Sequence, residues 1–422
     1  MFSILLWVLF VHYNFSAPTV AVTGHPGTVM GAALRNGLYR AILERKDGNE
    51  IVFNFEVKDS AGKKILYIRN AGERLLVDDI RQQGDSVWIR LPFFESQFRA
   101  VLTKEGNLDG VWLKRGVDTY QVVGFKAFYG QSYRFIAGKP ARIHNITGRW
   151  SSVFRSPDGK DTTFRVGEFV QEGSRVTGTF LDAGGDLRYL EGVMNGDSLR
   201  LSCFDGGHAY LFTARIDNDD KTFSGGQYFA GAVSRETWTA VKDDAAKLPD
   251  EFTITKWKND PPLGFTFKDI DGNTVSLKDA RFKGKVVLIQ IMGSWCPNCM
   301  DETRFLSGFY DEYRSKGVEI IGLAYERSTD FARSQNSVRS FQQRFQVKYP
   351  MLITGVAVGD PHRSEKTLPQ LERIENFPTT IFVGKNGKIE KVHTGFSGPG
   401  TGEHYEEQKK EFYSIVNNML GE

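Results

Sequence analysis

Two cysteines three positions apart are the residues best suited to chemistry in this sequence. Cys296 and Cys299 enclose Pro297 and Asn298, and Trp295 stands directly before them. Because helical periodicity begins just after this segment, Cys296 is expected at a helix N-cap or first turn, where unpaired backbone N–H groups and the helix dipole stabilise a thiolate. Only the thiolate attacks a disulfide, so Cys296 is the predicted nucleophile.

The second cysteine lies one helical turn further along. Cys299 should therefore face the same side as Cys296 and be less exposed, where it can resolve a mixed disulfide by forming a Cys296–Cys299 bond. Pro297 suits the first turn of a helix, because its missing N–H is not needed there. The spacing predicts a redox-active dithiol at the start of a helix.

Other interpretations of the pair are open. A Cys-x-x-Cys can be half of a zinc site, but such a site needs four ligands, the only other cysteine is Cys203 in a β-rich region, and no closely spaced histidine pair supplies the rest. Chance packing in a core is a second alternative. A peroxide-reducing site wants a threonine three residues before the reactive cysteine, and that position is Gly293. We predict no metal and no cofactor.

Strands and helices alternate around the cysteine pair. Val286–Met292 is a continuous apolar run, typical of a central strand covered on both faces. Phe305, Phe309 and Tyr313 recur every four residues and predict a helix that Gly317 ends. The remaining elements are a hairpin over 265–277, a strand over 318–324, a helix around Phe341, a hairpin over 379–392 and a helix around Phe412. This order indicates an α/β domain with a mixed sheet.

The region before this domain is rich in short strands. Glu50–Val57, Lys64–Arg69, Ser86–Leu91 and Phe98–Leu102 alternate apolar and polar residues or are β-branched and aromatic. Turn residues separate such segments at regular spacing over residues 37–245. This pattern favours an antiparallel barrel or sandwich.

The β-rich region also looks internally doubled, because Gly84–Leu91 is echoed by Gly196–Leu201. We predict two tandem meander modules, residues 37–135 and 146–245, with one larger two-sheet assembly as the alternative. A polar stretch and the breaker Asn259–Pro262 place the main domain boundary across 243–261. The fold class is thus multidomain, with an all-β N-terminal region of barrel-like modules followed by an α/β domain.

The amino terminus resembles an export signal. Residues 1–34 contain no charged side chain, and Phe2–Val11 is an apolar run shorter than the ~20 residues that span a bilayer. We predict a signal peptide over residues 1–21 and a periplasmic or cell-envelope location, with a buried first strand or helix as the alternative. No cysteine follows the run, so no lipid anchor is expected.

The composition excludes several classes of protein. The 54 Lys and Arg residues against 51 Asp and Glu residues give a formal charge of +3. That balance excludes a strongly basic nucleic-acid surface, and no nucleic-acid partner is predicted. A chain with 40% hydrophobic and 25% charged residues is globular. Three cysteines are too few for a disulfide framework.

Residues 262–422 resemble the thioredoxin superfamily, specifically the TlpA/ResA-like thiol–disulfide oxidoreductases, including members from Bacteroidetes-type bacteria. The resemblance is carried by Asp271-Gly272, Lys283–Leu288, Trp295–Cys299, Phe377–Thr380 and His393–Gly402. It implies a thioredoxin-like redox domain over 262–422, a disulfide-bearing protein as substrate, and an upstream electron donor such as a membrane thiol transporter.

Carried over residue by residue, the resemblance gives Cys296 and Cys299 the roles already described. Pro378 matches the family's cis-proline, and Phe377 before it would offer backbone groups to an extended substrate strand. Trp295 and Pro297 are further predicted substrate-binding residues. Glu302 matches an acidic residue expected to handle the proton of the second thiol. The alternatives are an ordinary helix-start carboxylate for Glu302 and a trans turn proline for Pro378.

Five positions need separate expectations. Arg304 replaces a proline that kinks the family's first helix, so this helix should be straighter. Gln290 replaces an acidic or amide residue, which leaves hydrogen bonding but not base catalysis. The insertion Thr354–Arg373 is expected as a solvated loop, His393 as a surface histidine, and Cys203 as an inert buried side chain.

Two hypotheses follow from the whole sequence. The first is an exported thiol–disulfide oxidoreductase, acting as a reductase, whose β-rich region recruits or orients partners. The second is a ligand-binding or adhesion protein of the β modules with an accessory redox domain. For the β modules the sequence leaves open a scaffold, a dimerisation surface, substrate docking, or a small apolar ligand held inside a barrel.

Overall fold

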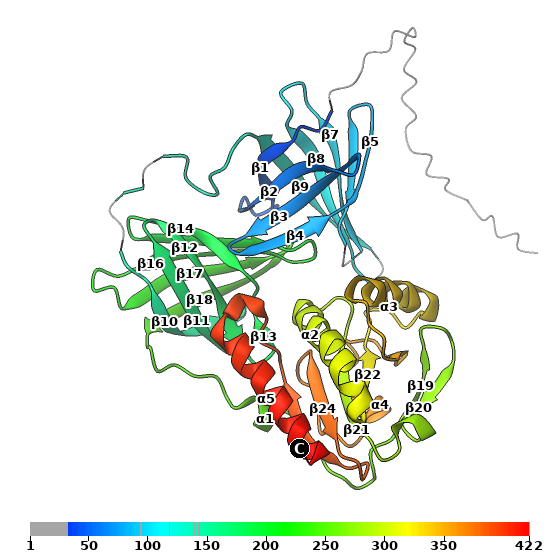
Figure 1. Ribbon diagram of the computed structural model, residues 1–422. Helices are drawn as coiled ribbons and strands as arrows, with labels where there is room; N and C mark the ends of the chain where they lie inside the picture. Colours follow the sequence, from blue (N-terminus) through cyan, green and yellow to red (C-terminus); the bar gives the residue numbers. More distant parts are fainter. Residues whose placement is uncertain (1–32, 93–94, 118, 139, 142–143, 422) are drawn as a thin grey trace, which may run out of the picture. The chain divides into compact units, whose positions relative to one another are not determined.

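Three β-sheets organise the part of the chain that the computed structural model describes, namely residues 33–92, 95–117, 119–138, 140–141 and 144–421 (Figure 1). These residues belong to one compact unit. The predicted signal peptide, residues 1–21, lies outside the described residues. Within them, no helix is both long and apolar enough to cross a membrane.

The first sheet is an antiparallel meander with the strand order β4-β3-β2-β1-β9-β8-β7-β6-β5. Its edge strands β4 and β5 are consecutive in the chain, and β3 contacts β5, so the sheet curls into a barrel that is open at this seam. The strands are β1 (Gly37–Glu44), β2 (Glu50–Ser60), β3 (Lys63–Asn70), β4 (Glu73–Val77), β5 (Asp79–Gln83), β6 (Ser86–Arg90), β7 (Ser96–Leu102), β8 (Leu108–Arg115) and β9 (Tyr120–Tyr129).

The second sheet closes on itself. Its order is β11-β10-β18-β17-β16-β15-β14-β12-β13, and β11 also pairs with β12. All strands except β13 therefore form a closed antiparallel barrel. The strands are β10 (Gly148–Arg155), β11 (Thr162–Glu172), β12 (Arg175–Asp182), β13 (Gly185–Asp186), β14 (Leu190–Asn195), β15 (Ser198–Phe204), β16 (Ala209–Ile216), β17 (Thr222–Ala230) and β18 (Ser234–Lys242).

Aromatic side chains fill the interior of the second barrel. Trp150, Phe154, Phe180 and Trp238 are almost fully buried, and the rings of Phe154 and Trp238 stack with centroids 5.8 Å apart. Cys203 is buried in the same cluster, and burial raises the pKa of its thiol well above the usual range. A small apolar ligand inside this barrel would have to displace these rings.

The two barrels share part of one core. The ring of Phe204, at the end of β15, stacks on that of Phe53 in β2 with centroids 4.3 Å apart. Leu211 of β16 belongs to the same apolar cluster as the interior of the first barrel. The predicted tandem antiparallel modules are confirmed, and they pack against each other through side chains rather than through strand pairing.

The third sheet has mixed direction, with the order β20-β19-β23-β22-β21-β24-β25. Strands β21, β22 and β23 are parallel, and β24 and β25 extend the sheet as an antiparallel hairpin. The strands are β19 (Thr266–Asp269), β20 (Thr274–Ser276), β21 (Val286–Met292), β22 (Val318–Ala324), β23 (Met351–Ile353), β24 (Thr379–Val383) and β25 (Ile389–Thr394). The helices are α1 (Glu251–Ile254), α2 (Pro297–Tyr313), α3 (Phe331–Phe345), α4 (Arg363–Thr367) and α5 (Glu403–Leu420).

Strand β21 is the centre of this domain. Helices α2, α3 and α5 bury their apolar stripes in one cluster that includes Val286, Leu288 and Met292 of β21. Val287, Ile289 and Ile291 belong to a second cluster on the other face. Every residue of Val286–Met292 is buried, which explains the continuous apolar run. The predicted bounds of this strand and of β22 are confirmed. The strand aims its carboxyl end at the start of α2, where the cysteine pair lies.

The expectation of a solvated loop over Thr354–Arg373 is wrong. The insertion Thr354–Arg373 is not a solvated loop, because it contains α4 and buries Leu368 and Leu371 against the sheet. Leu368 is 0% exposed and Leu371 is 2% exposed. These apolar side chains are embedded among charged residues in the sequence, which hides their packing role from a composition argument.

Candidate active site

The cysteine pair lies where β21 gives way to α2. Cys296 is the N-cap residue of α2, with Pro297 in the first turn, as the sequence predicts. The backbone N–H of Cys296 donates to the carbonyl oxygen of Gly293 at 3.0 Å, which closes the connecting turn. The backbone N–H of Cys299 donates to Cys296 Sγ at 3.2 Å. Cys296 Sγ therefore occupies the place of a capping oxygen and faces the positive end of the helix.

The two cysteines form a disulfide, with their Cα atoms 5.2 Å apart. Cys299 is 0% exposed and Cys296 is 3% exposed, so both cysteines are buried and Cys299 is the more deeply buried of the two. The order of exposure agrees with Cys296 as the attacking sulfur and Cys299 as the inner one.

The loop before β24 lies against Cys296. The Phe377–Pro378 peptide bond is cis, and the carbonyl oxygen of Phe377 is 3.5 Å from Cys296 Sγ. The rings of Phe377 and Trp295 meet edge to face, with centroids 5.4 Å apart. The fold therefore brings Trp295, Cys296, Phe377 and Pro378 together, although about 80 residues of chain separate the two loops.

Trp295 is held firmly beside the nucleophile. Its indole N–H donates to the carbonyl oxygen of Tyr325 at 2.8 Å. A Cβ atom on Gly293 would lie 2.2 Å from the indole nitrogen, so only glycine lets the ring fold back at this turn. The guanidinium of Arg327 lies 5.6 Å from the centroid of the indole ring.

Glu302 lies one helical turn after Cys299 and is fully buried. Its carboxylate accepts hydrogen bonds of 2.7 Å from the Thr380 hydroxyl and 2.7 Å from the Gln290 side-chain amide. The same amide group lies 3.4 Å from the carbonyl oxygen of Cys299. Burial raises the pKa of Glu302 to about 7, against the opposing effect of the two hydrogen bonds.

The partners of Glu302 belong to a polar row across three strands. Gln290 of β21 is paired with Thr380 of β24, and Thr380 is paired with His393 of β25. The sequence analysis singled out Gln290 for hydrogen bonding but missed Thr380. The available signal was the pair of hydroxyl side chains Thr379 and Thr380 at the start of a strand that is otherwise apolar.

His393 is not a surface residue, which corrects a second expectation. It is 1% exposed, because α1 and α5 cover its strand, and its Nε2 atom is 3.1 Å from the side-chain nitrogen of Gln408. The ring of Phe252, from α1, meets His393 edge to face. Helix α1 lies within the predicted domain boundary, residues 243–261, so no element was expected to cover His393.

Among the described residues, Glu251, His393 and Glu411 place one ligand-type atom each within 4.8 Å of one another. Such a set could contact a cation. Glu251 Oε1 is 3.6 Å from His393 Nε2, so the group also serves as packing between α1, β25 and α5. It lies on α1, β25 and α5, whereas the cysteine pair lies at the start of α2.

A hairpin of the second barrel lies against the cysteine pair. The side-chain amide of Asn298 donates to the carbonyl oxygen of Gly184 at 3.0 Å, and the backbone N–H of Phe396 donates to the same oxygen at 3.3 Å. Gly185 forms a parallel bridge with Phe396. A Cβ atom on Gly185 would lie 2.1 Å from the Phe396 carbonyl oxygen, so glycine is required for this close approach.

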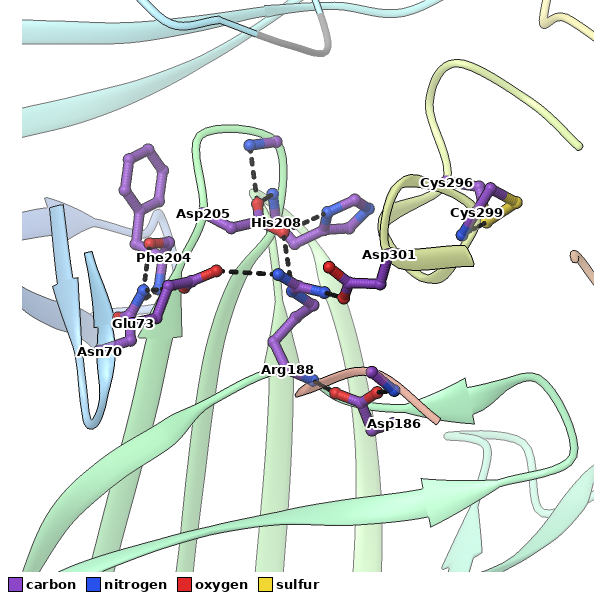
Figure 2. A network of polar contacts seen from close by, with 12 residues as sticks. Asn70, Glu73, Asp186, Arg188, Phe204, Asp205, His208, Cys296, Cys299 and Asp301 are labelled. Atoms are coloured by element: carbon purple, nitrogen blue, oxygen red, sulfur yellow. Dashed lines mark hydrogen bonds and ion pairs between the residues drawn. A yellow bond between two sulfur atoms is a disulfide. The ribbon is translucent and has the colours of Figure 1, made fainter. Parts of the chain in front are cut away.

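An ion-pair network joins the same barrel to α2. Figure 2 shows Arg188 between Glu73 of the first barrel and Asp301, two residues after Cys299. Arg188 bonds directly to Asp301, contacts Glu73 at 2.8 Å, and lies 3.7 Å from Asp205. Asp186 accepts a hydrogen bond of 2.7 Å from the backbone N–H of Gly398.

The charges in this network are strongly perturbed. Despite burial, the surrounding carboxylates hold the pKa of Arg188 well above its ordinary value. Burial raises the pKa of Asp186 to about 6, and the neighbouring Asp301 adds to this shift. The sequence analysis missed both Arg188 and the hairpin, since nothing in a glycine turn or a lone arginine specifies a partner more than 100 residues away.

The C-terminal part of the chain is similar to known redox proteins. Residues 251–408 match the Redoxin family. The thiol–disulfide oxidoreductase ResA of Halalkalibacterium halodurans is 30% identical over 134 residues, which cover 32% of this chain and 66% of the relative. ResA of Bacillus thuringiensis subsp. konkukian is 32% identical over 125 residues, which cover 30% of this chain and 62% of the relative.

The matched region thus spans a little under two thirds of these curated relatives. A solved thiol:disulfide interchange protein of the thioredoxin family from Chlorobium tepidum TLS is 20% identical, with a TM-score of 0.30, and the match covers 37% of this chain and 94% of that one. The two barrels lie before the region that matches the Redoxin family.

Proposed function

The chain carries a C-terminal Redoxin domain similar to that of ResA-type thiol–disulfide oxidoreductases, and on this premise we propose that it reduces disulfides of partner proteins through Cys296 and Cys299. One observation carries the proposal. Cys296 Sγ caps α2, is bonded to Cys299, and lies 3.5 Å from the Phe377 carbonyl oxygen beside the cis peptide bond. This arrangement combines a stabilised thiolate and a resolving thiol beside the Phe377–Pro378 loop.

The reaction starts from the dithiol form. The Cys296 thiolate attacks one sulfur of the partner disulfide, the partner S–S bond breaks, and the leaving sulfur takes up a proton. A mixed disulfide now joins Cys296 to the partner. Cys299 loses its proton and attacks Cys296 Sγ, which releases the second partner thiol. Two electrons have moved from the cysteine pair to the partner, and the Cys296–Cys299 disulfide remains.

The second step needs a group that accepts the Cys299 proton. We assign this role to Glu302, because it lies three residues after Cys299 on α2 and burial raises its pKa to about 7. A group with a pKa near the working pH exchanges protons in both directions. Gln290 and Thr380 hold the carboxylate in position.

A complete catalytic cycle also needs an electron donor, a cellular location and a way to orient the partner. The oxidised pair must be reduced again before the next cycle, and we assign this step to an upstream thiol donor such as a membrane thiol transporter. The apolar run Phe2–Val11, which has the length of a signal-peptide core, supports export to the periplasm or cell envelope. In this proposal the two barrels orient the partner against the redox domain.

Full-length protein tests the proposal directly. After reduction of the cysteine pair, the protein should reduce insulin or an uncharged small disulfide such as 2-hydroxyethyl disulfide, and Cys296→Ser should lower the rate to background. Cys299→Ser should instead accumulate a mixed disulfide. The matched control is Cys203→Ala, because that thiol is buried in the second barrel and should leave the rate unchanged. A wild-type protein without activity on both substrates contradicts the proposal.

A further inference from the structure

The protein itself occupies one side of the cysteine pair. The turn between β12 and β13, residues 183–185, bonds to Asn298 and Phe396, and Gly184 also lies against the carbonyl oxygen of Phe377. These contacts involve the cysteine loop, the loop before β24 and the loop after β25. A partner strand that approached from this side would have to displace the turn. Access to Cys296 is therefore expected along Trp295, which is not among the residues that the turn contacts.

The Trp295 side opens on a cavity of about 350 Å³. Its walls come from the ends of β7 and β8 in the first barrel, from α3, and from the segment Ser294–Trp295 directly before the nucleophile. This volume lies within the ~300–1,000 Å³ range of binding pockets. The cavity thus begins one residue from Cys296, and the first barrel supplies one of its walls.

Basic side chains dominate the cavity wall. The basic residues that line it are Arg90, Lys114, Arg115, Arg327 and Arg333, against the two carboxylates Glu95 and Glu326. Both carboxylates are already engaged. Glu95 pairs with Arg333 at 2.9 Å, and Glu326 accepts hydrogen bonds of 2.8 Å and 2.7 Å from the backbone and hydroxyl of Ser294. With five basic side chains against two carboxylates, the cavity wall carries an excess of positive charge.

Two of these cations influence each other. Burial lowers the pKa of Lys114 to about 8, and the nearby charge of Arg327 lowers it further while Asp205 opposes the shift. Burial also lowers the pKa of Arg327. Positive charges that repel one another in a half-enclosed space are stabilised when an anion enters between them.

We propose that this cavity binds a carboxylate-rich peptide segment that flanks the disulfide of the partner protein. The inference rests on the proposed function and adds a substrate class to it. The indole of Trp295 offers an apolar surface for the peptide, and the arginines offer forked donors that match carboxylates. An acidic segment held in the cavity would place its neighbouring disulfide beside Cys296.

Two model peptides test this substrate class on the full-length reduced protein. Both contain the same intramolecular disulfide, flanked by glutamates in one peptide and by lysines in the other. At low ionic strength the acidic peptide should be reduced at least about tenfold faster, as kcat/KM, and 0.5 M salt should shrink the difference. Equal rates for the two peptides overturn the inference.

Charge-reversal variants test whether the preference for the acidic peptide arises from the cavity wall. Arg115→Glu and Arg327→Glu should each lower kcat/KM for the acidic peptide about tenfold, and Arg115→Lys should retain most of it. Arg155→Glu is the matched control, because Arg155 is an exposed residue of β10 outside the cavity wall and the change in net charge is the same. If Arg155→Glu lowers the rate as much as Arg115→Glu does, net charge is the cause and the inference fails.

Two further measurements separate the inference from the proposed function. 2-Hydroxyethyl disulfide carries no charge, so Arg115→Glu should reduce it at the wild-type rate if the dithiol and the fold are intact. Calorimetric titration of Cys296→Ser protein with a cysteine-free acidic peptide tests binding without turnover. Absence of binding overturns the inference alone. If Cys296→Ser protein binds the peptide but wild-type protein does not reduce 2-hydroxyethyl disulfide, the cavity is supported and the proposed function is contradicted.

Discussion

Glu302 lies one helical turn after Cys299, and its carboxylate accepts a 2.7 Å hydrogen bond from the hydroxyl group of Thr380. Burial raises the pKa of this carboxyl group from 4.5 to about 7, although both hydrogen bonds to it act in the opposite direction. The group is therefore largely protonated in the folded protein below neutral pH. This property leads to predictions for both stability and catalysis.

The free energy of unfolding should depend on the protonation of Glu302. Between about pH 4.5 and pH 7 the folded protein keeps the Glu302 proton, whereas the unfolded chain releases it. Stability therefore falls as pH rises through this window, by an amount on the order of 3 kcal/mol, and this part of the pH dependence is absent in Glu302→Gln. Urea unfolding at pH 5 and pH 8 measures it. The same change between the two pH values in wild type and variant would contradict the assignment.

Glu302 should also affect the second half of the thiol exchange more than the first. Removing its titrating carboxyl in Glu302→Gln should slow the release of partner from the mixed disulfide about 100-fold at pH 7, with little change in the initial attack by Cys296. Acid quenching followed by gel separation measures the trapped mixed disulfide. Glu312→Gln is a matched control, because Glu312 is an exposed carboxylate on the same helix. Equal slowing of both steps would point to a structural role.

Local patterns were sufficient to predict much of this site. The position of Cys296 at the start of α2 follows from an apolar strand, a helical repeat and Pro297 between the cysteines. These signals lie within a few residues of one another, so the sequence displays them directly. The same holds for the strands of the two barrels, where alternation and turn residues mark each segment.

Local sequence patterns could not predict the contacts between distant segments of the chain. The bond between Arg188 and Asp301 spans 113 residues, and the bond between Asn298 and Gly184 spans 114. The residue type of Arg188 or of Gly184 does not specify which distant residue it will contact. The covering of His393 by α1 depends on how the predicted linker folds back onto the domain. Such choices are made by the packing of whole elements, which no short window of sequence contains.

The contact between Gly185 and Phe396 should control access to Cys296. In Gly185→Ala the new Cβ would lie 2.1 Å from the Phe396 carbonyl oxygen and 2.5 Å from the Asn298 side-chain nitrogen, so the turn must move away. We expect a loss of about 1–3 kcal/mol in stability and faster alkylation of reduced Cys296 by iodoacetamide. Mass spectrometry of the labelled peptide measures the rate.

A second glycine variant serves as the control for this prediction. Gly173 also has a positive φ, of 62°, but nothing lies within 4 Å of a Cβ atom placed there. Gly173→Ala should therefore leave the alkylation rate of Cys296 unchanged. If both variants alter it equally, or if Gly185→Ala alters nothing, the turn between β12 and β13 does not cover the cysteine pair.

Cys203 should be unreactive in the folded protein, even after reduction of the cysteine pair. It is fully buried, and burial raises the pKa of its thiol well above the usual range, so almost no thiolate is present at pH 8. Iodoacetamide should label it only after denaturation, whereas Cys296 is labelled in the native state. Native labelling of Cys203 at a rate near that of Cys296 would show that the barrel opens readily.

The ion pair between Arg188 and Asp301 should couple the second barrel to α2 energetically. Arg188→Leu leaves the carboxylates of Asp301, Glu73 and Asp205 without their shared cation, and we expect a loss of about 3–5 kcal/mol. Because Asp301→Leu removes one of these stranded charges, the double variant should lose less than the sum of the single losses, with a coupling energy of about 2 kcal/mol. Urea unfolding of all four proteins completes the cycle.

An exposed ion pair provides the comparison for this cycle. Lys348 and Asp311 approach to 2.7 Å, with side chains 56% and 50% exposed. Solvent screens this pair, so its coupling energy should stay below about 1 kcal/mol. If the coupling energy of Arg188 and Asp301 is no larger than that of the exposed pair, apolar packing holds the barrel and α2 together. The buried charges then add no net stability. A clearly larger value would show that Arg188 fixes the start of α2, and with it the direction from which a partner reaches Cys296.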